Sequence, residues 1–198
     1  NASGTIERVW PRRVNSFDYV VAHGQAIHAA GMAFDSCSQA TVTGGQVKLT
    51  NYTAVIWGAG QQMAGTITST AQTLLTTYLQ TGGGLFVSGS EIAFELGRAS
   101  SPSGSRTFFQ NQLHAKLASD AHTNSASYTV TALADGIFAG VSSGTIDNGG
   151  KGIYWVKGPE VITTNGIGSR AALNYGSGIG PAAVQYDGSA GGGRGVYF

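Results

Sequence analysis

The sequence predicts an α/β protein with a mainly parallel central sheet. Two short apolar runs, residues 54–57 and 85–87, lie on either side of an amphipathic segment, and neither run alternates apolar with polar residues. Runs of this kind are typical of strands that are buried on both faces. The order strand, helix, strand predicts a βαβ unit within residues 53–96, and its two strands should run parallel.

The helix inside this unit is predicted over residues 69–81. Its apolar residues recur at helical spacing, and Leu75 lies at the centre of the stripe that they form. The segment begins with a capping-box signature at residues 69–72 and ends before Gly82. We therefore expect this helix to bury one face against the sheet.

Ahead of the unit, the sequence predicts a helix over residues 16–30 and a short strand at 32–34. Asn15 and Ser16 are suitable N-cap residues, and Gly31 provides a C-terminal stop. The first helix and the helix inside the unit are expected to flank the sheet.

Beyond the unit, two more helices are predicted, near residues 92–96 and over 109–117. From about residue 124, short apolar runs alternate with glycine-rich turns, as in strands joined by tight connections. We expect a single α/β domain over residues 1–198 whose part after about residue 124 is rich in strands. Because the chain stops inside an apolar run, we also expect it to be a fragment of a longer protein.

The composition excludes several classes of protein. Charged residues make up only 11% of the chain and the net charge is +1, which is too little to build the basic face of a nucleic-acid-binding protein. No apolar run approaches the ~20 residues that span a bilayer. The single cysteine, Cys37, cannot form an internal disulfide. Low charge with abundant glycine favours a secreted, extracellular protein.

Three segments carry a resemblance to a known domain family: residues 17–24 (FDYVVAHG), 33–36 (AFDS) and 82–92 (GGGLFVSGSEI). They look like a domain of secreted bacterial multidomain proteins, some of which are xanthan-lyase-like or active on cell walls and polysaccharides. That domain is similar to the class I glutamine-amidotransferase-like fold, a relative of the ThuA-like proteins. The resemblance implies a flavodoxin-like three-layer sandwich, with a further strand before residue 1 and further chain after Phe198.

The candidate binding site follows from the expected topology of the sheet. Open α/β sheets bind ligands outside the carboxyl ends of their strands. In this chain those ends are followed by Asp35, by Gln61 and Gln62, and by the turn at residues 88–91. We expect Asp35, Gln61 and Glu91 to converge in one crevice.

The candidate catalytic residues are Ser88, Ser90, Glu91 and His114. The resemblance places the nucleophile elbow of the amidotransferase-like fold at the turn that contains both serines, where helix amides can stabilise an oxyanion. A serine nucleophile also needs a base, for which His114 is the candidate. However, the sequence lacks the His-x-Glu pair of glutamine amidotransferases. Capping of a helix explains the serines without catalysis, and the helix dipole explains Glu91.

No cofactor and no metal site are expected. His23 and His28 are five residues apart, about 140° around a helix, so one ion cannot bind both from one face. Gly58 and Gly60 do not complete a phosphate-binding loop motif, because no Lys-Ser/Thr pair follows them.

Two functions remain open from the sequence. The first is a non-catalytic accessory module of a secreted bacterial polysaccharide- or cell-wall-active protein, with carbohydrate or other domains of the parent protein as partners. The second is a serine hydrolase that acts on an ester or amide bond through the turn at residues 88–90.

Overall fold

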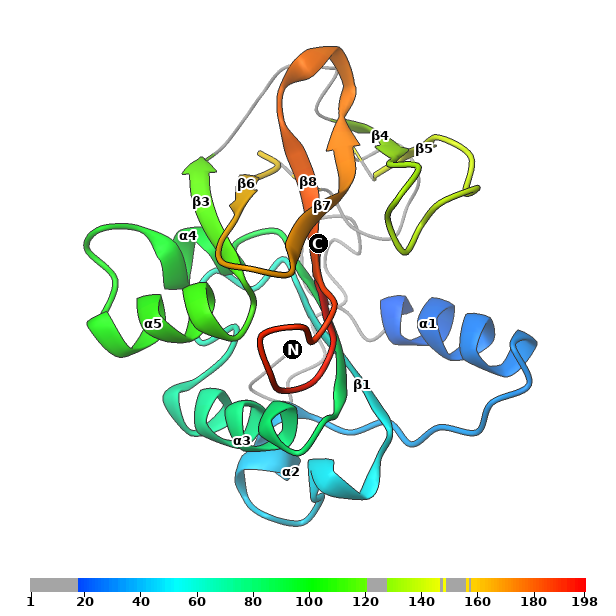
Figure 1. Cartoon of the computed structure of the whole chain (residues 1–198). Coiled ribbons are helices and arrows are strands. Elements are labelled where there is room, and N and C mark those ends of the chain that lie inside the picture. The colour runs from blue at the N-terminus through cyan, green and yellow to red at the C-terminus, as the bar shows by residue number, and fades with distance from the viewer. Residues whose placement is uncertain (1–17, 121–127, 147, 149–155, 157) are drawn as a thin grey trace, which may run out of the picture.

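The computed structural model of the chain describes residues 18–120, 128–146, 148, 156 and 158–198. Its central element is a seven-stranded mixed sheet with the strand order β1-β2-β9-β8-β7-β4-β5 (Figure 1). β1 (Ala54–Gly60) pairs in parallel with β2 (Gly84–Gly89), which pairs in parallel with β9 (Gly195–Tyr197). The other four pairings in this sheet are antiparallel.

The strands on the antiparallel side come from the last third of the chain. They are β4 (Thr129–Ala132), β5 (Gly144–Thr145), β7 (Ser169–Tyr175) and β8 (Pro181–Tyr186). A second, two-stranded antiparallel sheet joins β3 (Ala115–Ser119) to β6 (Val161–Thr164). β7 and β8 form the long hairpin that stands out at the top of Figure 1.

The helices of the described part are short. They are α1 (Asp18–Ala29), α2 (Gln39–Thr43), α3 (Ser69–Gln80), α4 (Ile92–Gly97) and α5 (Ser103–Asn111), with 3-10 turns η1 (Leu49–Asn51) and η3 (Gly176–Gly178). Among these described helices, none has the length and apolar character that crossing a membrane requires.

The predicted βαβ unit is present as β1, α3 and β2. Leu75 of α3 is 0% exposed and Leu79 is also buried, so the apolar stripe faces the core as expected. The N-cap is Thr68, one residue before the predicted capping box, and its hydroxyl accepts the N–H of Ala71. The turn into β2 is made tight by Gly83, because a Cβ there would lie 2.2 Å from the Cζ atom of Tyr78.

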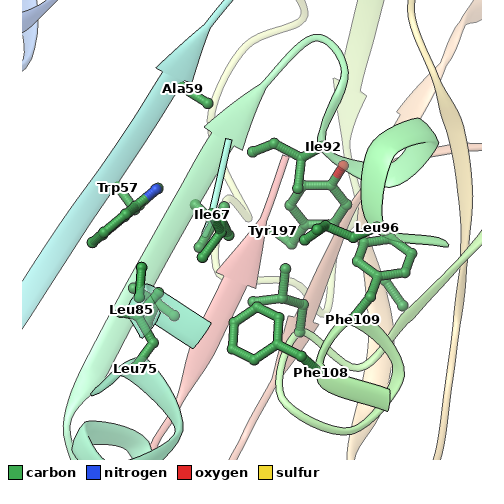
Figure 2. Packing of buried hydrophobic residues seen from close by; sticks show 14 of the residues in the cluster. Trp57, Ala59, Ile67, Leu75, Leu85, Ile92, Leu96, Phe108, Phe109 and Tyr197 are labelled. Carbon is green, nitrogen blue, oxygen red and sulfur yellow. The ribbon is translucent and has the colours of Figure 1, made fainter. Parts of the chain in front are cut away.

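The main core lies between α3, α4, α5 and one face of the sheet (Figure 2). Val87 of β2 is in register with Tyr197 of β9, which is in register with Val184 of β8, and all three are buried. The Tyr197 ring meets the Phe109 ring of α5 edge-on, with centroids 5.4 Å apart. This contact joins the end of the chain to the helical layer.

The predicted fold class, a flavodoxin-like three-layer sandwich around a mainly parallel sheet, is wrong. The sheet is mixed and strongly curled, like half a barrel, and helices are few. Parallel neighbours need a crossover of roughly a dozen or more residues. Residues 176–180, between β7 and β8, and 187–194, between β8 and β9, are shorter than that, so the chain turns straight back and the strands pair antiparallel.

Three local predictions also fail. The strand expected at residues 32–34 does not form, and β1 is the edge of the sheet on that side. The helix expected over residues 109–117 ends at Asn111 and is followed by β3, because Leu113 and Ala115 belong to an alternating buried pattern rather than a helical one. β1 is not buried on both faces either, since Ile56 is 42% exposed.

Candidate functional site

The turn after β2 is fastened to the ends of its two neighbouring strands. The N–H of Ser90 donates to the carbonyl of Gly60 at 2.9 Å, and the Ser90 hydroxyl donates to the same oxygen at 3.2 Å. The N–H of Gly89 donates to the carbonyl of Phe198 at 3.2 Å. The Ser90 hydroxyl therefore ties the end of β2 to the end of β1, which is a structural use of that group.

The structure does not bring the candidate base to the candidate nucleophiles. Within the described residues, neither the Ser88 nor the Ser90 hydroxyl forms a hydrogen bond with a histidine. His114 lies beside Gly193, and Gly193 packs against the carbonyl of Gly83, just before β2 begins. The serines lie toward the other end of β2, a strand of 6 residues that spans roughly 20 Å. His114 and the two serines therefore do not form a nucleophile–base pair.

Glu91 instead belongs to a cluster of three carboxyl groups. Oxygen atoms of Glu91, Asp120 and Glu160 all lie within 4.8 Å of one another. Glu91 follows β2, Asp120 follows β3, and Glu160 directly precedes β6, so three separate parts of the chain meet here. Sequence reasoning missed Asp120 and Glu160 as partners of Glu91. The signal that could have found them was a lone acidic residue, Glu160, directly beside an apolar strand.

Glu160 is the buried member of this cluster, with 6% of its surface exposed. It accepts hydrogen bonds from the backbone N–H groups of Ala93 and Phe94 at the start of α4, and from the hydroxyl of Tyr197 at 3.2 Å. These donors favour the ionised carboxylate and lower its pKa. Burial disfavours ionisation more strongly, and together with the nearby charge of Glu91 it raises the pKa of Glu160 to about 8.

Glu160 is therefore mostly protonated at neutral pH. Burial, and then the charge of Asp120, also raise the pKa of Glu91. Within the described residues, the one ion pair joins Arg170 to Asp187, so none of the described basic side chains forms an ion pair with the cluster. Three close oxygen ligands resemble a site for a hard cation. However, both oxygens of Glu160 are directed at the amides of α4, which leaves Glu91 and Asp120 as the available ligands.

The candidate binding residues have separate local roles. The amide of Gln62 donates to the carbonyls of Ala64 and Gly65 within its own loop, at 2.8 and 2.9 Å. Asp35 accepts a hydrogen bond of 2.8 Å from the hydroxyl of Tyr52, a residue that precedes β1. This bond holds Asp35 nearer the amino end of β1.

Gln61 and Glu91, by contrast, follow the carboxyl ends of β1 and β2. The structure therefore places Gln61 and Glu91 at one edge of the sheet and does not bring Asp35 to it. The loop after Gln61 is held by Glu95, whose carboxylate accepts the backbone N–H groups of Gly65 and Thr66. Glu95 therefore stabilises the loop at this edge of the sheet, which is a structural role and needs no ligand.

Proteins of known structure with this fold are found among the β-galactosidases. The cold-adapted β-galactosidase from Rahnella sp. R3 matches with a TM-score of 0.58 and 17% sequence identity, over 93% of this chain and 24% of that one. The β-galactosidase from Bacillus circulans sp. alkalophilus matches with a TM-score of 0.58 and 13% identity, again over 93% and 24%. The chain thus spans about a quarter of the length of these enzymes. At this identity the likeness establishes the fold alone.

No protein-family model and no curated protein matches the chain. The resemblance to a glutamine-amidotransferase-like, flavodoxin-like domain of xanthan-lyase-like proteins is therefore corrected. The structural neighbours are β-galactosidases.

Proposed function

We propose that this chain is a non-catalytic accessory module of a secreted bacterial protein that acts on polysaccharide or on the cell wall. The observation that carries the proposal is the match of nearly the whole chain to about a quarter of two β-galactosidases. The chain would accordingly be one part of a larger protein whose catalytic centre lies elsewhere. Its partners would be carbohydrate and the other domains of that protein.

The geometry of the turn after β2 supports a module without catalysis of its own. A serine hydroxyl is a weak nucleophile unless a neighbouring base accepts its proton during attack. Ser90 uses its hydroxyl to bind the carbonyl of Gly60, and His114 lies at the opposite end of β2. A serine hydrolase would need another base at this turn. The low charge of the chain is in keeping with secretion.

Two assays on the purified chain test this proposal. The first follows hydrolysis of acetyl and nitrophenyl esters and of a nitrophenyl β-galactoside, for which we expect no turnover above the buffer rate. The second follows retention on insoluble polysaccharides in a sedimentation assay, for which we expect saturable binding to at least one of them. Saturable ester hydrolysis that disappears in Ser88→Ala or Ser90→Ala would overturn the accessory function and establish a hydrolase.

A further inference from the structure

A cavity of about 260 Å³ lies beside the loop that joins β8 to β9. Its walls come from three parts of the chain: the end of α3 with Gln80, the end of α5 with Asn111 and the segment after it with His114, and the end of β8 with Tyr186 together with residues 191–193 of the β8–β9 connection. Its volume lies just below the range that is usual for small-molecule sites, roughly 300–1,000 Å³. The cavity is separate from the carboxylate cluster and from the turn that carries the serines.

One wall is a fixed pair of rings. The imidazole of His114 stacks on the ring of Tyr186, with centroids 3.6 Å apart and an angle of 15° between the planes. The hydroxyl of Tyr186 donates to the carbonyl of Gly191 at 2.8 Å and accepts the N–H of Ala190 at 2.9 Å. Tyr186 therefore holds the ring of His114 by stacking and the loop at residues 190–191 by hydrogen bonds.

The backbone of His114 has an uncommon conformation. Its φ is 52°, in the left-handed region that few residues other than glycine adopt, although histidine, asparagine and aspartate occur there more often than the rest. Its carbonyl accepts the N–H of Asn165 at 2.8 Å and the hydroxyl of Ser169 at 2.9 Å, which fixes this conformation. Strain that the surroundings maintain in this way is concentrated at binding and catalytic sites.

The polar groups of the cavity are neutral. Among the described residues, no lysine, arginine, aspartate or glutamate lines it. Burial lowers the pKa of His114, which favours the uncharged ring. Gln80, Asn111 and Gln112 line the cavity, and each has a side-chain amide that can both donate and accept hydrogen bonds. The cavity thus combines ring surface, amides and exposed loop backbone without a charge.

We propose that this cavity binds one neutral sugar ring of a saccharide chain, an inference that rests on the function proposed above. The amides match the adjacent hydroxyls of a sugar, which also donate and accept, and the His114–Tyr186 pair offers an apolar surface to the C–H face of the ring. Gly191 carries no side chain, and no atom lies within 4 Å of the place where its Cβ would be, so a ligand can approach the backbone closely there. A phosphorylated ligand would find no cation among these lining residues, and a purely apolar one would leave the amides unpaired.

An NMR titration of the whole chain with free galactose, glucose, mannose and xylose, and with a soluble galactan, tests this site. We expect saturable shifts of the backbone amides of residues 191–193 with at least one of these saccharides. Gln80→Ala and Asn111→Ala should each weaken binding about two- to tenfold, the effect of one lost neutral hydrogen bond. His114→Asn should also weaken it, because asparagine tolerates the positive φ but removes the ring. Gln46→Ala, an exposed glutamine outside the cavity, should leave binding unchanged.

The outcomes separate this inference from the function on which it rests. If saccharide binds but the shifts lie elsewhere and the three cavity variants bind like the wild type, the cavity is not the site while the accessory function stands. If the chain is retained on a polysaccharide but no monosaccharide or galactan shifts residues 191–193, the cavity proposal is likewise overturned. Ester turnover that depends on Ser88 or Ser90 would remove the accessory function itself, whatever the cavity binds.

Discussion

Oε2 of Glu160 accepts the backbone N–H of Ala93 at 2.8 Å, so α4 is capped by a side chain 67 positions further along the chain. Oε1 of the same residue accepts the N–H of Phe94. The residue at the N-cap position, Glu91, makes no capping hydrogen bond with its side chain. Glu160 therefore supplies acceptors for amides that a helix start leaves unsatisfied.

This arrangement predicts that stability falls as the pH rises. The pKa of Glu160 is raised from 4.5 to about 8 in the folded protein, so between these values the folded state holds a proton that the unfolded state has lost. The contribution of Glu160 to the free energy of unfolding is then fully present below about pH 4.5. It is lost progressively as the pH rises toward 8, by at most several kcal/mol. Urea unfolding at pH 5, 6, 7 and 8 measures the slope.

The matched variant is Glu160→Gln, which removes the titrating group. Its stability should depend less on pH over this range than that of the wild type. It should be less stable at pH 5, because an NH2 group that cannot accept replaces one of the two oxygens that accept the amides of α4. The pKa of His114 is lowered in the folded protein, so His114 reduces the free energy of unfolding as the pH falls below about 6.5. This effect is the same in the wild type and in the variant. A wild-type stability that rises from pH 5 to 8 by the same amount as the variant's would contradict the assignment.

A second prediction concerns the packing of α3. Leu75→Ala should lower the free energy of unfolding by roughly 2–5 kcal/mol, because Leu75 is 0% exposed and its loss leaves a cavity in the core. Gln80→Ala, at the exposed end of the same helix, should change it by less than about 0.5 kcal/mol. Urea denaturation compares the two variants, and equal effects would mean that the wrong face of α3 has been assigned to the core.

A third prediction concerns the glycine before β2. Gly83→Ala should destabilise the protein by roughly 1–3 kcal/mol, because the new Cβ would meet the buried ring of Tyr78 at 2.2 Å. Gly104, inside α5, serves as the control, because a Cβ added there would meet no atom within 4 Å. Gly104→Ala should stabilise by about 0.5–1 kcal/mol through helix propensity. Thermal melts of the two variants should therefore shift in opposite directions.

A fourth prediction separates the two serines. Ser90→Ala should cost roughly 0.5–1.5 kcal/mol of stability, because it removes the hydrogen bond to the carbonyl of Gly60. Ser88→Ala should cost less, since no such bond involves the Ser88 hydroxyl in the described structure. Neither change should alter the background rate of ester hydrolysis. A loss of stability in Ser88→Ala but not in Ser90→Ala would contradict the role given to the Ser90 hydroxyl in holding the turn.

Much of the candidate site cannot be read from the sequence, for a physical reason visible in particular residues. Ser90 and Glu91 are correctly predicted to follow a strand, and Ser88 lies near the carboxyl end of that strand, because the apolar run before them is a local pattern. Their partners are not predicted, because Glu160 approaches Glu91 only through the packing of β6 against the rest of the fold. The prediction of a helix over residues 109–117 is wrong at His114, whose positive φ places it in a turn, where it stacks on Tyr186. The structure does not bring His114 to the serines for which it is the candidate base.

The order of residues along the chain alone determined the βαβ unit and the buried face of α3. Both follow from periodicity over a few turns, and Leu75 lies in the core as that periodicity requires. The tertiary structure alone decided the direction of the strands after residue 128, the carboxyl cluster and the ring stack at the cavity. Each of these depends on contacts between segments that are distant in the sequence, such as Tyr197 with Phe109 or Glu160 with Ala93. The free energy of such contacts comes from burial and hydrogen bonding in the folded protein, which local sequence patterns do not show.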